Sequence, residues 1–561
     1  MGNGIGKLGI CFAGGCGEVS GRRHDIAVNL LDPLDEGLGH SFFYIKPDPS
    51  AKTHPFSDDS CASATTTISS TSSMTTAFHT ICGASISANT STPLSTALFD
   101  LGHEKASAFE SSQFFSSIPL QPVPRSCIPS VRSGPIPGVS GLGSSHIEGG
   151  FLSAPILDNQ YYQVQRYKPK SENWNLFRDL KKFFSTDLKE SETKNCYGVH
   201  SISSQASLTE EDNDDIGKDS SFRGQSVQWA QGKAGEDRVH VVISEEHDLV
   251  FVGIYDGFNG PDATDFLLQN LYTNVFKELK GLSQWAEKPE PDVLNALSEG
   301  LRKTEMDYLN ITDLMLNENP ELALMGSCVL AMLMKGQDVF LMNVGDSRAV
   351  LAQRPADECD GTTMGVDIDK LYRAMSDRKH NMTSHQLTVD HCASTTEEVK
   401  RIKREHPDDS SAIKNDRVKG SLAVTRAFGA AYLKHPKWND AVLEAFRVDY
   451  KGDASYINCI PSLHHHKLGP KDKFLILSSD GLYQYFTNEE AVSEVETFMS
   501  IFPDGDPAQH LIEEVIFRAA KKAGMDFHEL LDIPQGQRRR YHDDVSIIVI
   551  SFEGRLWQSS M

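Results

Sequence analysis

Acidic residues stand at the ends of four hydrophobic runs in the later part of the chain. They are Asp256, which with Gly257 follows LVFVGIY; Asp480, which with Gly481 follows KFLILSS; Asp543 and Asp544, which precede VSIIVI; and Glu236 and Asp237, which lie before VHVVI. A carboxylate fixed at the edge of a core is costly unless it is paired or bound to a cation. Mg²⁺ and Mn²⁺ prefer such oxygen ligands. One Asp-Gly dipeptide alone is more typical of a plain turn, but the four acidic sites together predict a divalent metal site.

Such a site is suited to the hydrolysis of phosphate esters. Two ions that share one carboxylate activate a water molecule and neutralise a phosphoryl group during in-line displacement. Other phosphate chemistries lack their motifs, because the chain has no GxxxxGK[ST] loop and no HRD or DFG sequence. His391-Cys392 is followed by Glu398 where a cysteine phosphatase needs a phosphate-clamping arginine. We therefore interpret Cys392 as a structural loop residue.

The elements that must position these residues are visible as hydrophobic patterns after residue 221. Short β-branched runs predict strands at 239–243, 249–255, 328–333, 338–344, 348–352, 473–478 and 545–550. Periodicity predicts helices at 261–279, 291–310, 395–405, 488–500 and 508–523, the third with a capping box from Ser394 to Glu397. This mixture predicts an α+β domain with sheets at its centre. Polar stretches at 353–386 and 430–455 are expected to be insertions in surface loops.

The part of the chain before residue 221 has a different composition. Residues 47–150 are rich in Ser, Thr, Pro and Gly, which predicts disorder, and aromatic and basic residues at 159–200 predict a short helix or a partner motif. Ten cysteines without a CxxC pair favour a reducing compartment. Among the 561 residues, 54 Lys and Arg stand against 77 Asp and Glu, a net charge of −23, which argues against nucleic acid as a partner.

Eight short segments resemble the metal-dependent Ser/Thr protein phosphatases of type 2C, in the family's order. They are GEDR (235–238), YDGFNG (255–260), GSCVL (326–330), NVGDSRAVL (343–351), LTVDH (387–391), GSLAVTRAFG (420–429), LSSDGL (477–482) and HDDVS (542–546). The resemblance covers residues 221–555 and implies a central β-sandwich of two antiparallel sheets flanked by helix pairs. Residues 31–220 would then be a largely disordered regulatory region.

The resemblance also implies roles for individual residues. Asp256 would bridge two Mg²⁺ or Mn²⁺ ions, the Gly257 carbonyl would bind one of them, and Asp480 and Asp543 would bind the other. Glu236 and Asp237 would act through metal-bound waters, and Asp346 with Asp480 could hold a weaker third ion. The implied substrates are phosphoserine and phosphothreonine in proteins.

Two positions depart from the family pattern. Phe258 stands where most members have a histidine proposed as general acid, and general acid catalysis is worth roughly 10²–10⁴-fold in rate. Gly232 stands where many members carry a phosphate-binding arginine, and the adjacent Lys233 could substitute as a point charge or be a solvated surface residue. We expect a working but slow phosphatase. The alternatives are a pseudophosphatase that binds phosphorylated partners or membrane lipids, and a hydrolase of small phosphate esters.

The first residues carry features of a lipid anchor. Gly2 begins an incomplete N-myristoylation signal, and Cys11 and Cys16 could carry a second acyl chain, so residues 1–30 are a possible anchor segment. The MGNG start and YDGFNGPDA resemble the plant Poltergeist-like subfamily, which implies receptor-kinase signalling at the cytoplasmic face of the plasma membrane. A cytoplasmic or nuclear location is the alternative. His464, His465 and His466 could bind a metal, but a solvent-exposed polar loop is the favoured reading.

Overall fold

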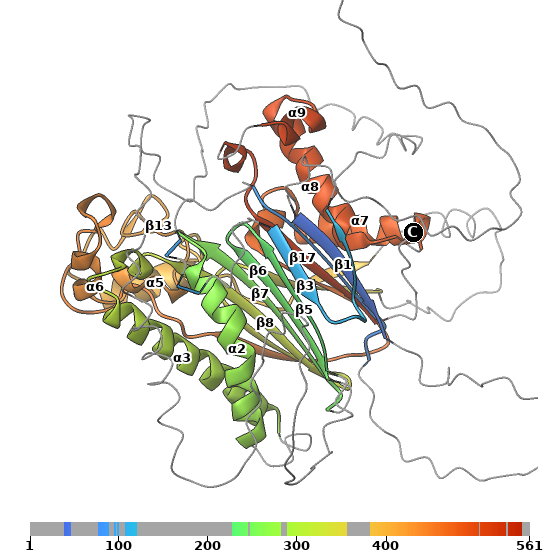
Figure 1. The fold of residues 1–561 in the computed structure, drawn as a ribbon, viewed down its shortest axis with the longest axis horizontal. Helices are drawn as coiled ribbons and strands as arrows, with labels where there is room; N and C mark the ends of the chain where they lie inside the picture. Colours follow the sequence, from blue (N-terminus) through green and yellow to red (C-terminus); the bar gives the residue numbers. More distant parts are fainter. Residues whose placement is uncertain are drawn as a thin grey trace, which may run out of the picture.

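The computed structural model describes residues 39–46, 77–88, 95–96, 98–99, 107–120, 227–244, 247–281, 289–355, 382–503, 505–533 and 537–552. Two antiparallel sheets face each other at its centre (Figure 1). The first sheet has the order β11 (Thr383–Gln386), β10 (Arg348–Gln353), β16 (Asp472–Ser478), β17 (Val545–Ser551), β2 (Thr80–Ile86), β1 (Gly39–Ile45) and β4 (Ser116–Pro119). The second has the order β15 (Ser462–Lys467), β9 (Asp338–Val344), β8 (Gly326–Lys335), β7 (Leu249–Phe258), β6 (Asp237–Ser244), β5 (Val227–Ala234) and β3 (Ser107–Ser111), and β14 (Phe428–Gly429) pairs with β8.

Three hydrophobic layers hold this sandwich together. One layer lies between the sheets and joins residues such as Phe42 and Ile548 of the first sheet to Val241 and Ile254 of the second. Helices α2 (Asp262–Gly281) and α3 (Glu290–Leu314) pack on the outer face of the second sheet. Helices α7 (Asn488–Ile501), α8 (Pro507–Ala523) and the short α9 (Phe527–Leu531) cover the first sheet (Figure 1). The predicted fold class, a two-sheet sandwich flanked by helix pairs, is confirmed.

Most predicted elements occur within a few residues of their predicted bounds. The seven predicted strands are β6, β7, β8, β9, β10, β16 and β17, and the five helices are α2, α3, α5 (Thr396–Glu405), α7 and α8. The capping box at Ser394 is wrong, because the residue before α5 is Thr395 and no side chain caps that helix. No helix in the described ranges combines the length and apolarity that crossing a membrane would require.

The prediction that residues 31–220 are largely disordered is wrong for four segments. β1, β2, β3 and β4 all belong to the central sheets, so the folded domain does not begin at residue 221. β2 lies between β17 and β1 and is buried along its whole length. The side chain of Ser85 in this strand pairs with β17, because Ser85 Oγ donates to Ser546 Oγ at 3.1 Å. The prediction for residues 159–200 lies outside the described residues.

Two other local predictions are also corrected. Residues 430–455 were expected to form a surface loop, but η3 (Ala431–Leu433) and α6 (Pro436–Ala441) contribute to a small core in which Tyr432 and Val442 are buried. The histidines at 464–466 lie in the edge strand β15 and not in a loop. Of the stretch 353–386, residues 383–386 form β11 at the edge of the first sheet, and 356–381 lie outside the described residues.

Candidate metal centre

The predicted carboxylates meet where the ends of four strands from both sheets come together. Asp237 begins β6 and Asp256 lies near the end of β7, while Asp480 follows β16 and Asp543 precedes β17. A direct contact spans the two sheets at this point, because Ser479 Oγ donates a hydrogen bond of 3.0 Å to Asp237 Oδ2. The pleated strands therefore fix these acidic side chains at the seam of the sandwich.

Asp346 and Cys328 complete the cluster on the side of the second sheet. One ligand atom from each of Asp256, Cys328 and Asp346 lies within 4.8 Å of the other two. Cys328 is opposite Asp256 in the pairing of β7 with β8, and its thiol donates to Asp346 Oδ1 at 3.4 Å. Burial, followed by the charges of Asp346 and Asp256, raises the pKa of the Cys328 thiol, which therefore stays protonated.

The electrostatics of this cluster favour a bound cation. Burial raises the pKa of Asp256, and the charges of Asp237, Asp480, Asp543 and Asp346 raise it further. Burial and neighbouring carboxylates raise the pKa of Asp480 and Asp237 in the same way. The pKa of Asp346 rises to about 6 and that of Glu236 to about 7, again chiefly through burial. Divalent cations would relieve this repulsion between ionised groups.

The donor set fits a hard divalent ion. Apart from the protonated Cys328 thiol, the side chains of the cluster are carboxylates. Asp237 Oδ1 is buried without a hydrogen-bond partner among the described residues, so this oxygen remains available as an acceptor. Gly257, whose carbonyl is a predicted ligand, allows the close approach of β6. A Cβ at this position would lie 2.5 Å from the carbonyl oxygen of Glu236. The residues predicted from sequence are thus brought together in an arrangement suited to Mg²⁺ or Mn²⁺.

Asp544 has a supporting role that differs from that of its neighbour Asp543. It accepts hydrogen bonds from the backbone N–H of Glu236 and of Ala88, both at 2.8 Å, and from Ser87 Oγ at 3.3 Å. These bonds tie β17, the β5–β6 turn and the residues after β2 into one unit. The turn needs Gly235, whose φ is +62° and whose Cβ would lie 2.1 Å from Asp544 Oδ2.

Arg539, which the sequence analysis did not single out, lies beside these carboxylates. It belongs to η6 (Arg538–Arg540), and its guanidinium lies 3.2 Å from Glu236, 3.0 Å from Asp543 and 3.9 Å from Asp544. The three consecutive arginines just before the HDDVS segment were the available signal. Sequence alone does not show which of the three contacts the carboxylates.

The structure places the two departures from the family pattern differently. Lys233 lies on β5 with its side chain on the face opposite Ala234, whose partner in the sheet is Asp237. This outer face of the sheet packs against helix α2, because Arg238, the residue opposite Lys233 on β6, pairs with Asp265 of α2 at 2.6 Å. Lys233 is therefore not grouped with the carboxylates. Phe258 packs partly buried against the core of the 402–457 region, next to Gly326.

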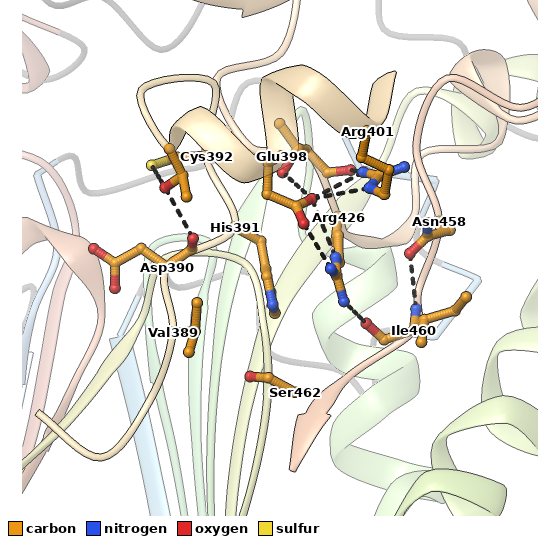
Figure 2. Close-up of polar contacts among 12 residues, drawn as sticks. Val389, Asp390, His391, Cys392, Glu398, Arg401, Arg426, Asn458, Ile460 and Ser462 are labelled. Carbon is orange, nitrogen blue, oxygen red and sulfur yellow. Dashed lines mark hydrogen bonds and ion pairs between the residues drawn. The ribbon is translucent and has the colours of Figure 1, made fainter. Parts of the chain in front are cut away.

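A second charged cluster lies near the centre and has a structural character. Glu398, at the start of α5, forms ion pairs with Arg401 and Arg426 (Figure 2). The distances from Nη2 of each arginine to the Glu398 carboxylate are 2.9 and 2.6 Å. Burial opposes ionisation of Glu398, but these hydrogen bonds outweigh it and lower the pKa of Glu398 to about 2. Cys392 contacts Ser394 Oγ at 2.9 Å in the same region, in keeping with a structural loop cysteine. His391 Nδ1 accepts a hydrogen bond of 3.2 Å from the backbone N–H of Gly345, which joins this cluster to the loop that carries Asp346.

Comparison with known proteins agrees with this geometry. The family model described as Protein phosphatase 2C matches residues 222–525. The chain is similar over the full length of both proteins to Probable protein phosphatase 2C 4 and Probable protein phosphatase 2C 23 of Arabidopsis thaliana, at 49% and 48% identity. It is 44% identical, again over the full length of both chains, to Protein phosphatase 2C 35 of Oryza sativa subsp. japonica. The chain therefore belongs to the protein phosphatase 2C family of serine/threonine phosphatases.

Proposed function

We propose that this chain is an active phosphatase that uses two Mg²⁺ or Mn²⁺ ions to hydrolyse phosphoserine and phosphothreonine in proteins. The observation that carries this proposal is the convergence of Asp237, Asp256, Asp346 and Asp480 at the seam of the sheets, where burial and mutual repulsion raise all four pKa values. A domain that only binds partners has no need for so many buried, mutually repelling carboxylates.

Each residue has a defined task in this proposal. Asp256 and the Gly257 carbonyl, with Asp480 and Asp543, would hold the two ions, which supply a nucleophilic hydroxide and neutralise charge on the phosphoryl group. Glu236 and Asp237 would orient water molecules around the ions, and Asp346 with Asp480 would serve a weaker third ion. Asp544 fixes the turn that carries Glu236. The phenyl ring of Phe258 cannot transfer a proton to the leaving alkoxide.

The test uses the full chain, because β1 to β4 belong to the folded domain. Wild type, Asp256→Asn and the surface control Asp408→Asn are stripped of metal and assayed on a phosphothreonine peptide over a range of Mn²⁺ concentrations. We expect turnover that depends on Mn²⁺ in wild type and in the control, and a loss of at least about 10²-fold in Asp256→Asn.

The competing function is a pseudophosphatase that binds phosphorylated partners or membrane lipids without turnover. Phe258 and Gly232 favour it, because each removes a group that most relatives use. Calorimetry distinguishes the two functions: Mn²⁺ binding by wild type without turnover on any phosphopeptide would support the binding protein and contradict the enzyme.

We further propose that the protein acts in signalling at the plasma membrane on phosphorylated proteins such as receptor kinases. The support is the sequence likeness to the Poltergeist-like subfamily and the lipidation signals at Gly2 and Cys11, both of which lie outside the described residues. A fluorescent fusion that carries Gly2→Ala should leave the membrane. One acyl chain binds a membrane only marginally, and attachment of the second chain depends on the membrane contact that the first chain provides. An unchanged distribution would count against lipid anchoring.

A further inference from the structure

Arg539 forms a cationic edge on a site that is otherwise strongly anionic. Its Nη1 lies 3.2 Å from Glu236 Oε2, and its Nη2 lies 3.0 Å from Asp543 Oδ1. Together with Asp544 at 3.9 Å, these contacts fix the plane of the guanidinium from one side. The side chain nevertheless remains 30% exposed, which leaves part of it accessible to solvent. A guanidinium held in this way presents preorganised N–H donors to a ligand.

The charge of Arg539 extends over the predicted metal ligands. Asp543, Asp544, Glu236 and Asp256 all stabilise its positive charge, and outweigh the effect of burial on its pKa. Arg539 in turn lowers the pKa of Asp480, against the larger effect of burial. An anionic substrate that approaches these carboxylates therefore meets a fixed positive charge at the same place.

The two positions that the sequence suggested for phosphate binding cannot supply this charge. The space beside Gly232 is filled by His40 of β1, since a Cβ on Gly232 would lie 2.0 Å from His40 Nε2. Lys233 lies on the outer face of β5, opposite Ala234. Of the cations in the described ranges, Arg539 is the one whose guanidinium pairs with both Glu236 and Asp543.

We propose that Arg539 binds the phosphoryl group of the substrate and takes the place of the arginine that this chain lacks at position 232. The guanidinium would donate two hydrogen bonds to a phosphate monoester dianion while its contacts with Glu236 and Asp543 hold it in place. This inference rests on the proposed phosphatase function. It names a residue for substrate recognition that the family motifs in the sequence do not identify.

The experiment compares full-length Arg539→Gln, Arg539→Lys and Arg540→Gln with wild type. Arg540 is an exposed neighbour on the same 3-10 helix, so its substitution removes the same charge without touching the site. The readouts are KM and kcat on a phosphothreonine peptide, the inhibition constant of inorganic phosphate, and the Mn²⁺ concentration for half activation. Hydrogen bonds to charged groups are worth about 1.5–3 kcal/mol. For Arg539→Gln we therefore expect KM and the phosphate inhibition constant to rise about tenfold or more.

The outcomes separate phosphate binding from a merely structural role. Arg539→Lys should show a smaller rise, because a point charge replaces the fork, and Arg540→Gln should behave as wild type. If Arg539→Gln raises the Mn²⁺ midpoint while phosphate inhibition is unchanged, Arg539 only positions Glu236 and Asp543, and the inference is overturned. If Arg539→Gln does not fold, Arg539→Lys tests the inference instead. An unchanged phosphate inhibition constant in Arg539→Lys would then overturn the inference.

Failure of the proposed function gives a different result from failure of this inference. If wild type shows no turnover, the enzyme proposal fails, but calorimetric titration of the Mg²⁺-loaded protein with inorganic phosphate still tests Arg539. Equal phosphate affinity in wild type and Arg539→Gln would then overturn the inference alone.

Discussion

At the scale of single residues, Phe258 occupies the position at which most members of the family have a histidine. It follows the Asp256-Gly257 pair and packs partly buried beside Gly326, where a Cβ would lie 2.5 Å from its ring. Serine and threonine alkoxides are poor leaving groups and gain from a proton donor, whereas a nitrophenolate leaves without one. The missing acid should therefore appear as a dependence of rate on the leaving group.

We predict that Phe258→His accelerates the hydrolysis of a phosphothreonine peptide by about tenfold or more, since general acid catalysis is worth roughly 10²–10⁴-fold. The rate on p-nitrophenyl phosphate should change little. The measurement is kcat on both substrates at saturating Mn²⁺, with Phe258→Leu as a control that removes the ring and adds no acid. A parallel increase on both substrates would contradict the acid role.

A second residue-scale prediction concerns the glycine of the β5–β6 turn. Gly235 and Gly336 both have positive φ, +62° and +55°, but only Gly235 lies against another group, Asp544. Gly336→Ala should cost about 1–2 kcal/mol in unfolding free energy from backbone conformation alone. Gly235→Ala should cost more and should also raise the Mn²⁺ midpoint, because the Asp544 contact with Glu236 is displaced. Urea unfolding and Mn²⁺ titration of the two variants would check this, and equal effects would contradict it.

The carboxylates could be predicted from sequence because their strands are continuous hydrophobic runs that end at an acidic residue. Asp256 and Asp480 follow such runs directly, and the packing of the two sheets against each other then brings them together. Cys328 and Arg539 could not be predicted in this way. The first depends on the register between β7 and β8, and the second on the direction of one side chain in a short 3-10 helix.

At the scale of elements, the missed strands show the limit of composition. β2 reads TICGASI, a stretch of small and polar residues within a Ser/Thr-rich region, yet all seven residues are buried. The Ser85 hydroxyl is paired across to β17, which offsets the cost of its burial, whereas Thr80 Oγ1 is buried without a partner among the described residues. Neither hydrophobic alternation nor charge marks this strand in the sequence. By contrast, β16 and β17 are apolar enough to be recognised alone.

Asp506, at the start of α8, links that helix to β1. It accepts a hydrogen bond from Ser41 Oγ at 2.8 Å and caps the helix through the N–H groups of Ala508 and Gln509. Burial outweighs these bonds and raises the pKa of Asp506 from 3.8 to about 6. Because the folded state then binds the proton more tightly, this contribution to stability is full below about pH 4 and is lost as the pH rises through about 6.

We therefore predict that Asp506→Asn removes this pH dependence. Asparagine is an equally good helix cap, and its amide can donate to Ser41 Oγ. Wild type loses the Asp506 contribution as the pH rises, whereas the variant does not. The melting temperature of the variant relative to wild type should therefore rise between pH 5 and pH 7. Thermal melts at both pH values would measure it. Asp506→Ala, which loses the cap, should be less stable than Asp506→Asn at either pH, and a pH-independent difference between Asp506→Asn and wild type would contradict the assignment.

At the scale of the whole molecule, the N-terminal strands make the catalytic domain discontinuous. β2 pairs with β17 on one side and β1 on the other, and Ser87 and Ala88 contact Asp544 beside the metal centre. The segment that the family model matches, residues 222–525, is thus shorter than the segment that folds.

We predict that residues 221–561 alone do not form a stable phosphatase. Removal of β2 exposes the edge of β17 and part of the core between the sheets. The truncated chain should be insoluble or melt without cooperativity, and co-expression with residues 31–125 should restore Mn²⁺-dependent activity. A soluble, active 221–561 fragment would show that the N-terminal strands are dispensable.

The position of β2 also affects how the chain can fold during synthesis. Ser85 and its partner Ser546 are 461 residues apart, so the first sheet cannot close until the last strand has left the ribosome. At roughly 5–20 residues per second, β2 lacks its neighbour β17 throughout most of translation. Closing so long a loop adds little to the equilibrium cost, which grows only with the logarithm of length, but it slows folding. Dependence on chaperones in the cell is therefore an expected property of this architecture, separate from its final stability.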